Sequence, residues 1–284
     1  MRVSIGITEY PGPRHPDAAP LTAVATAADE SVLDTLWVSD HAVQYAPGTS
    51  PEDPILEAYT TLGWIAARTS RIRLGTMVTA VTFRPATLLI KAVSSLDALS
   101  GGRAWFGVGA GYDEREAAEM GLPLPPVAER FEYLEDTLQL AHRMWAGDTS
   151  PFVGKQVRAD RPVSSPTPEH RPRILIGGMG EKRTLPLIAQ YGDACNLPDI
   201  ADGGATLRRK LDVLARACDA VGRPFDAIEK TVATAIGPDE PADAFAERLA
   251  TLAENGLEHA TVISRGPWTD DALARVADGA RQLA

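Results

Sequence analysis

Two patterns of apolar and polar positions alternate along the whole chain. Short apolar runs rich in Val, Ile and Leu are typical of buried strands, and each precedes a longer segment with apolar residues three and four positions apart, which is typical of an amphipathic helix. The stripe of Leu207, Leu211, Leu214 and Cys218 illustrates the helical pattern. The strands are predicted at 2–8, 35–39, 72–78, 104–108, 173–176, 193–196, 228–235 and 260–264.

The helical segments lie between these strands. They are predicted at about 17–33, 53–68, 86–99, 127–146, 182–191, 204–221, 241–254 and 269–282. Eight strands that are each followed by a helix favour a closed parallel barrel, whereas an open doubly wound sheet usually has about six strands. The chain has 284 residues, a length that such barrels reach as one domain. We therefore predict the α/β class, with one (β/α)8 TIM barrel domain over 1–284.

The longest segment without periodicity is 146–172, which is rich in Pro, Ser and Thr. A loop of this length is usually a functional lid or a mobile connection, and the alternative is a connection without a function of its own. Loops that follow strands carry substrate specificity in barrels, so we expect 42–52, 112–126 and 146–172 to select the substrate.

Composition narrows the classes of partner. A net charge of −10 argues against nucleic acid as the principal partner, because binding to phosphates needs clustered Lys and Arg. Two cysteines, Cys195 and Cys218, are too few for a disulfide framework, which favours a reducing compartment. The start of the chain lacks an apolar segment of signal-peptide length, and no stretch reaches 18 apolar residues. We expect a cytoplasmic protein that acts on a small-molecule substrate without a membrane span.

Candidate chemistry begins after the second predicted strand, where the sequence LWVSDH places Asp40 and His41. A histidine at the carboxyl end of a barrel strand is suited to acid or base catalysis, and an adjacent carboxylate is suited to fixing its tautomer. The alternative is that Asp40 caps a helix and His41 is solvated. The third strand, RIRLGTMVTAVTFRP, continues past the expected strand end, which is compatible with a bulge or kink at Gly75. An ordinary core strand is the alternative, and the pattern otherwise favours it.

A glycine cluster at Gly107, Gly109 and Gly111 follows the fourth strand and precedes Tyr112. Its spacing is G-x-G-x-G and differs from the dinucleotide fingerprint G-x-G-x-x-G. Small residues allow a flat ring to approach the backbone, and Tyr112 would border that ring. The alternative is that these glycines relieve crowding inside the barrel.

A second glycine cluster, Gly177, Gly178 and Gly180, follows the fifth strand in ILIGGMGEKRTL. The predicted helix after it presents free backbone N–H groups, and Lys182 and Arg183 add positive charge to its first turn. We predict a phosphate or phosphodiester site here, with a tight turn carrying solvated basic residues as the alternative. No metal site is predicted, because His15, His41, His142, His170 and His259 show no metal-ligand spacing.

Four segments together resemble the bacterial luciferase-like superfamily, and within it the oxidoreductases that use coenzyme F420 in actinobacteria and archaea. They are LWVSDH, RIRLGTMVTAVTFRPATL, GRAWFGVGAGYDEREAAEMGLP with the downstream RFEYLEDTLQLAHRMW, and ILIGGMGEKRTLPLIAQYGDACN. The likeness covers nearly the whole chain. It implies a barrel with F420 or FMN across its C-terminal mouth, and a hydride transferred to or from the ring.

The resemblance also implies roles for individual residues. Relatives often have a non-prolyl cis peptide behind the ring, at the position of Met77 and Val78, and Asp40 and His41 match positions near the ring and substrate. The cofactor contacts implied by the glycine clusters and the bulge are Met77, Val78, Gly109, Gly111, Tyr112, Gly177, Gly178, Met179, Gly180, Glu181, Lys182 and Arg183. Relatives are commonly homodimers, which makes a homodimer a candidate assembly, although the sequence itself does not give the oligomeric state.

One position departs from the family. The sugar-phosphate dehydrogenases of this family have an acidic glutamate where Tyr112 stands here, which argues against glucose 6-phosphate as the substrate. The leading hypothesis is an F420-dependent oxidoreductase with His41 as proton donor or acceptor. The alternatives are an FMN-dependent monooxygenase supplied by a flavin reductase, a flavin-binding barrel without turnover, and a barrel enzyme whose glycine loop binds a phosphorylated substrate.

Overall fold

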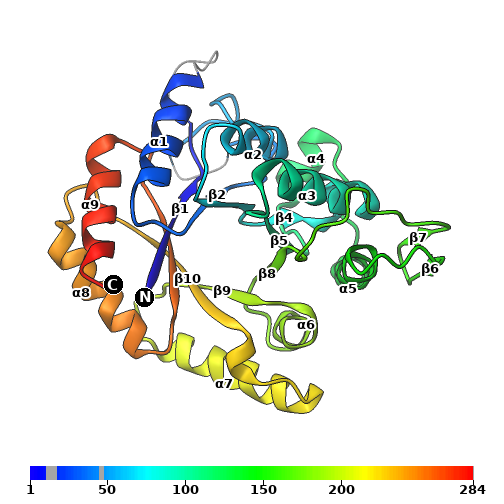
Figure 1. Cartoon of the computed structure of the whole chain (residues 1–284). Helices are drawn as coiled ribbons and strands as arrows, with labels where there is room; N and C mark the ends of the chain where they lie inside the picture. Colours follow the sequence, from blue (N-terminus) through cyan, green and yellow to red (C-terminus); the bar gives the residue numbers. More distant parts are fainter. Residues whose placement is uncertain (11–17, 45–47, 284) are drawn as a thin grey trace.

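A computed structural model describes residues 1–10, 18–44 and 48–283. Its parallel strands form one barrel with the order β3-β2-β1-β11-β10-β9-β8-β5-β4 (Figure 1). The strands are β1 (Arg2–Ile7), β2 (Thr35–Val38), β3 (Arg73–Thr76), β4 (Thr79–Ala80), β5 (Trp105–Gly109), β8 (Arg173–Gly177), β9 (Ala194–Pro198), β10 (Glu229–Ala235) and β11 (His259–Ile263). The third predicted strand is divided into β3 and β4. The barrel closes there, because Leu74 pairs with Ala104 and β4 pairs with β5.

Helices surround the barrel, as predicted (Figure 1). The expected eight are α1 (Ala18–Glu30), α2 (Ala58–Ala66), α3 (Ala86–Ser100), α5 (Val127–Trp145), α6 (Thr184–Tyr191), α7 (Ala205–Val221), α8 (Ala242–Glu254) and α9 (Asp270–Arg281). The sequence pattern missed α4 (Glu114–Met120), the 3-10 turns at Val81–Phe83 and Phe225–Ala227, and the hairpin of β6 (Phe152–Val153) and β7 (Arg158–Ala159). The start predicted for the first helix, residue 17, lies outside the described residues.

The barrel strands are apolar because helices cover their outer side and side chains fill the interior. Every residue of β2 and β5 is buried, and one apolar cluster extends from β1 to α9. A parallel sheet that is buried on both faces is expected to be a near-continuous apolar run rather than an alternating one. The (β/α)8 barrel prediction is therefore confirmed.

The segment 146–172 is anchored to α5. Phe152 and Val157 are buried in the core, and the Asp136 carboxylate accepts the backbone N–H groups of Gln156 and Val157 at 2.6 and 3.0 Å. The hairpin within this segment lies beside α5 in Figure 1. The segment contributes no residue to the lining of the large cavity described below, and its role as a functional lid stays a prediction.

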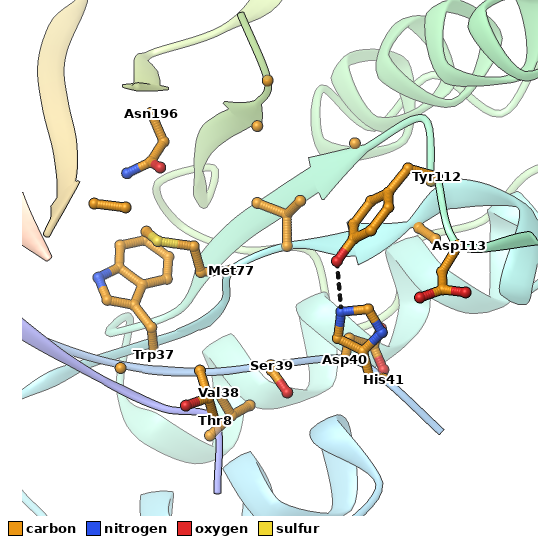
Figure 2. Close-up of a pocket in the computed structure, with 18 of the residues that line it drawn as sticks. Thr8, Trp37, Val38, Ser39, Asp40, His41, Met77, Tyr112, Asp113 and Asn196 are labelled. Carbon is orange, nitrogen blue, oxygen red and sulfur yellow. Dashed lines mark hydrogen bonds between the residues drawn. The ribbon is translucent and has the colours of Figure 1, made fainter. Parts of the chain in front are cut away.

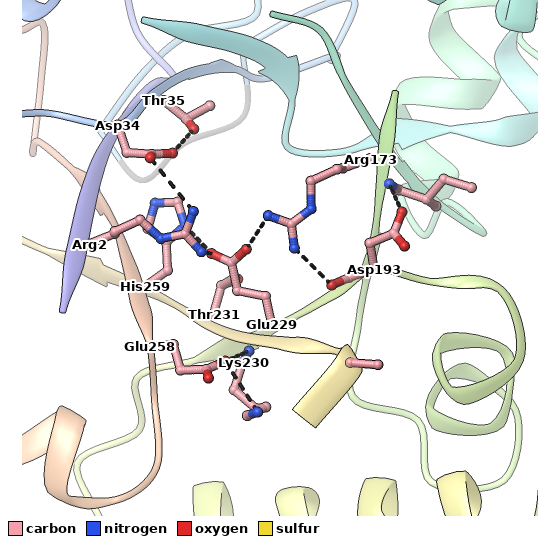
Figure 3. Close-up of polar contacts among 12 residues, drawn as sticks. Arg2, Asp34, Thr35, Arg173, Asp193, Glu229, Lys230, Thr231, Glu258 and His259 are labelled. Atoms are coloured by element: carbon pink, nitrogen blue, oxygen red, sulfur yellow. Dashed lines mark hydrogen bonds and ion pairs between the residues drawn. The ribbon is translucent and has the colours of Figure 1, made fainter. Parts of the chain in front are cut away.

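A buried polar cluster lies at the amino-terminal ends of the strands, opposite that cavity (Figure 3). The side chain of Glu229, 4% exposed, contacts His259 Nδ1 at 2.6 Å, Arg2 at 2.6 Å and Arg173 at 2.8 Å. His259 Nε2 is hydrogen-bonded to Ser4 Oγ. Burial alone would raise the pKa of Glu229, but the hydrogen bond from His259 and the neighbouring positive charges lower it to about 2.

The substitution Glu229→Gln is expected to lower the free energy of unfolding by about 1–3 kcal/mol at pH 7. It takes the carboxylate away from the buried His259 and from the partly exposed guanidinium groups of Arg2 and Arg173. A carboxyl with a depressed folded pKa stabilises the fold above its unfolded pKa of about 4.3, and that contribution is lost as the pH falls towards 2. Urea unfolding should therefore show a smaller difference between variant and wild type at pH 3 than at pH 7. The exposed Glu254→Gln is the control, and an equal loss in both variants would contradict the prediction.

Candidate active site

The main cavity, of about 510 Å³, opens at the carboxyl ends of the barrel strands. Active sites of (β/α)8 barrels are built at this face. Figure 2 shows Trp37, Met77 and Asn196 grouped on one side of the cavity and His41, Tyr112 and Asp113 on the other. The predicted site residues that line it are Asp40, His41, Met77, Val78, Gly109, Gly111, Tyr112, Gly177 and Gly178. Lining residues that sequence reasoning missed include Trp37, Glu116, Phe131, Thr184, Asn196 and Thr261.

His41 follows β2 and has a partner at each ring nitrogen. Its Nδ1 lies 2.8 Å from Glu116 Oε2, and its Nε2 lies 3.3 Å from the hydroxyl of Tyr112 (Figure 2). The prediction that the adjacent Asp40 fixes the tautomer of His41 is wrong, because Glu116 occupies that place. The hydrogen bond with Glu116 raises the pKa of His41 above its ordinary value, although burial opposes the shift. His41 is therefore held where it can give or accept a proton in the cavity.

The carboxylate of Glu116 is fully buried and joins α4 to the loop after β2. One oxygen accepts the His41 hydrogen bond and the other accepts the backbone N–H of Ala42. Asp113 caps α4 by accepting the N–H of Glu116 at 2.9 Å, which fixes the first turn of the helix. The D-x-x-E pattern at 113–116 was the available signal for a helix start. It does not predict that the glutamate turns towards His41.

Asp40 is buried and binds a different partner, Arg84. The two residues make a bidentate contact with N–O distances of 2.6 and 2.9 Å, and Thr79 Oγ1 donates to the same carboxylate at 2.6 Å. Arg84 also binds Glu57 at 2.6 Å. Burial raises the pKa of Asp40, while the Arg84 guanidinium opposes that shift. Asp40 thus connects the end of β2 to the segment after β4.

The irregularity in the third strand lies at Met77 and Val78, whose peptide bond is cis, at the position that the family resemblance indicates. Gly75, where the sequence was compatible with a bulge, is paired regularly with Trp37 in β2. A Cβ at Gly177 would lie 2.8 Å from Val78 Cγ2, and one at Gly109 would lie 3.0 Å from the same atom. These two glycines therefore leave space for the Val78 side chain beside the cavity.

Crowding also explains another glycine of the first cluster. A Cβ at Gly107 would lie 1.7 Å from the carbonyl oxygen of Thr76, so no other residue fits. Gly111 has a φ of 76°, a left-handed conformation that favours glycine. The crowding interpretation is thus correct for Gly107, while Gly109 and Gly111 line the cavity.

The second glycine cluster forms the rim of the cavity. Helix α6 begins at Thr184, so Lys182 and Arg183 lie in the preceding turn and not in its first turn, which corrects the predicted helix start. Both are exposed, and Arg183 lies over the ring of Phe131, which lines the cavity, at 5.4 Å. Met179 and Gly180 are exposed at the same rim. The Glu181 carboxylate instead binds Arg209 and Lys210 at 2.5 and 2.7 Å.

Residues 1–10, 18–44 and 48–283 contain no cluster of three or more His, Cys, Asp or Glu side chains arranged for a metal ion. His15 lies outside these ranges. Within them, every helix is too short or too polar to cross a bilayer.

Known structures share this barrel. An F420-dependent secondary alcohol dehydrogenase, solved with an F420-acetone adduct, superposes with a TM-score of 0.81 at 17% identity, covering 98% of both chains. A riboflavin lyase, solved with a modified FMN and riboflavin, gives a TM-score of 0.80 at 14% identity, covering 99% of this chain and 90% of the other. At these identities the likeness establishes the fold alone.

Similarity in sequence shows the family as well as the fold. An F420-dependent glucose-6-phosphate dehydrogenase of Kineococcus radiotolerans is 29% identical over 231 residues, which cover 79% of this chain and 66% of the relative. The matched region thus spans slightly less than two thirds of that curated relative. The family model for luciferase-like monooxygenases matches residues 2–282. The chain therefore belongs to the luciferase-like monooxygenase family.

Proposed function

We propose that this protein is an oxidoreductase that transfers a hydride between coenzyme F420 and a small organic substrate. The observation that carries the proposal is the contact of His41 with Glu116 and Tyr112 at the edge of the main cavity. An oxidoreductase of this kind must move a proton at the substrate oxygen as well as a hydride at carbon, and His41 is placed for the proton. The similarity to an F420-dependent dehydrogenase supports the choice of cofactor.

The residues of the cavity fit a flavin-type ring. Two buried polar atoms, the indole N–H of Trp37 and the hydroxyl of Thr261, lack hydrogen-bond partners within the described part of the chain, and both residues line the cavity. Buried polar groups of this kind are normally satisfied, so a polar ligand is expected to reach them. When bound, a deazaflavin supplies the acceptor or donor of the hydride.

Most of the predicted contacts have a role in this proposal. Met77 and Val78 would support the ring, and Gly109, Gly111 and Tyr112 would border it. The rim formed by residues 177–183, with Lys182 and Arg183, would hold the phosphodiester of the cofactor. Ionic contacts with Arg are well suited to phosphate because the guanidinium donates two parallel hydrogen bonds.

The chemistry that we assign to the side chains of this protein is proton transfer. With Nδ1–H donating to Glu116, the Nε2 atom of neutral His41 accepts a hydrogen bond or takes a proton from a substrate hydroxyl. In the opposite direction the imidazolium gives that proton to a carbonyl oxygen. Glu116 stabilises the charged imidazolium, and Asp40 with Arg84 maintains the position of the loop that carries His41.

Titration of the purified protein with F420 and with FMN tests the cofactor. Saturable quenching of F420 fluorescence is expected, and tight binding of FMN without binding of F420 would remove the deazaflavin assignment.

An FMN-dependent monooxygenase is the second candidate, favoured by the structural likeness to a protein solved with a modified FMN. Oxygen consumption with reduced FMN and a flavin reductase would identify it. F420 binding without turnover would indicate a flavin-binding barrel protein.

The substitution Arg183→Ala is expected to weaken F420 binding by about tenfold, because it removes one charge-assisted contact to phosphate. The change in Kd is measured by fluorescence titration. Arg216→Ala, which removes an exposed arginine from α7, serves as the matched control and should bind F420 like the wild type. Equal affinity of the Arg183 variant and the control would contradict the assignment of the rim to the phosphodiester.

A further inference from the structure

The cavity offers no free counter-ion to a negatively charged substrate. Among the described residues that line it there is no lysine or arginine, and three of its residues are acidic, namely Asp40, Asp113 and Glu116. Three arginines near these residues, Arg84, Arg115 and Arg130, lie outside the cavity lining. Arg115 pairs with Glu119 at 3.0 Å. Arg84 is shared between Asp40 and Glu57, and Arg130 donates to the backbone carbonyl of Gly111 at 2.8 Å.

The basic residues at the rim do not change this conclusion. Lys182 and Arg183 lie outside the cavity lining, and the proposed function assigns them to the phosphodiester of the cofactor. With the cofactor bound, they are no longer available to a phosphate or carboxylate of the substrate.

Two of the three acidic residues of the cavity, Glu116 and Asp40, are fully engaged and are unavailable to a positively charged substrate. Glu116 accepts hydrogen bonds from His41 and Ala42, and Asp40 is bound by Arg84 and Thr79. Asp113 accepts the N–H of Glu116 as the cap of α4. That cap uses one carboxylate oxygen, so a substrate ammonium would meet an acceptor at the His41 side of the cavity (Figure 2) and would have to displace existing contacts to reach another carboxylate.

Much of the remaining lining is apolar. It includes Ile7, Val38, Phe83, Phe131 and Ile263. A charged group taken from water into such surroundings without a partner loses its hydration and gains little in return. An uncharged substrate has no such cost, and its single oxygen can contact His41 or Tyr112 at the polar edge of the cavity.

We infer that the substrate of this site is an uncharged, mainly apolar alcohol or ketone, and that sugar phosphates are excluded. This inference rests on the proposed F420-dependent function and names its substrate class. It separates this chain from the glucose-6-phosphate dehydrogenases to which it is similar in sequence.

The test compares compounds that share a cyclohexanol ring and differ in charge. Cyclohexanol is neutral, trans-4-hydroxycyclohexanecarboxylate is an anion and trans-4-aminocyclohexanol is a cation at pH 7, and glucose 6-phosphate is added as the sugar phosphate. Binding of each to the F420-loaded protein is measured by saturation-transfer difference NMR, and kcat/KM is measured from the change in F420 absorbance. F420 binding itself is established first by fluorescence titration.

Cyclohexanol is expected to bind and to have a kcat/KM at least about 100-fold above that of each charged compound. A comparable or higher value for either charged cyclohexanol or for glucose 6-phosphate would overturn the inference. So would binding of F420 without binding or turnover of cyclohexanol. Failure of F420 to bind would instead refute the proposed function, so the two failures are distinguishable.

Discussion

Replacing His41 with alanine is expected to lower kcat of the F420-linked reaction by about 10²–10⁴-fold, the usual contribution of a positioned acid or base. The Nε2 atom of His41 faces Tyr112 at the cavity edge, and no second imidazole lines the cavity among the described residues. The Kd for F420 should change much less, because the contacts that we propose for the phosphodiester lie at the rim formed by 177–183. Steady-state kinetics and F420 titration measure the two effects separately.

Tyr112→Phe is the matched control for this prediction. It keeps the ring that lies edge-on to His41, with centroids 5.9 Å apart, and removes only the hydroxyl that contacts Nε2. We expect a decrease in kcat well below that of His41→Ala. If His41→Ala retains the wild-type kcat while folding normally by circular dichroism, His41 is not the acid or base. If Tyr112→Phe loses as much activity as His41→Ala, the proton donor is the tyrosine.

The barrel was predictable from sequence because its signal is repeated. Eight apolar runs and eight helical stripes each carry some error, yet together they favour one architecture. The same reasoning missed α4, whose seven residues EREAAEM are mostly charged and give little apolar periodicity. Short polar helices are determined by their caps and tertiary contacts, here the cap at Asp113 and the buried Glu116.

The site was predictable only where chain position determines spatial position. His41 lies at a strand end, so its place at the cavity follows from the barrel. Its partner Glu116 lies 75 positions away in sequence, and Asp40, adjacent to His41, points to Arg84 instead. Successive residues of an extended segment point in opposite directions, so adjacency in sequence is weak support for contact between side chains.

The roles of the glycines were also not predictable from the sequence alone. From sequence, the glycines at 109 and 177 are indistinguishable from turn residues or from a cradle for a ligand. Their shared neighbour is Val78, which lies between β3 and β4 and is distant from both glycines in sequence. Only the structure shows that each glycine leaves space for its side chain. The cluster at 177–180 was assigned to an anion site because it precedes a helix, and that assignment stays a prediction.

The substitution Glu116→Gln is expected to lower the pKa of His41 towards its ordinary value of about 6.5, because a neutral amide cannot stabilise the imidazolium. Its effect on activity should depend on pH. If the imidazolium is the proton donor in ketone reduction, activity should fall as the pH rises and His41 loses its proton. This fall should occur at a lower pH in the variant than in the wild type. The His41 pKa is measured by NMR titration of its ring, a readout that does not require the cofactor.

The same substitution should change stability with a defined sign. A histidine whose folded pKa is raised stabilises the native state fully below its unfolded pKa of about 6.5, and this contribution is lost as the pH rises through the folded pKa. The difference in free energy of unfolding between wild type and Glu116→Gln should therefore be larger at pH 6 than at pH 9.

Glu119→Gln removes one charge from the exposed side of the same helix and is the control. If both variants leave the His41 pKa unchanged, Glu116 fills space beside His41 without controlling its charge. If only Glu116→Gln lowers it, the buried carboxylate sets the pH range over which His41 can act as an acid.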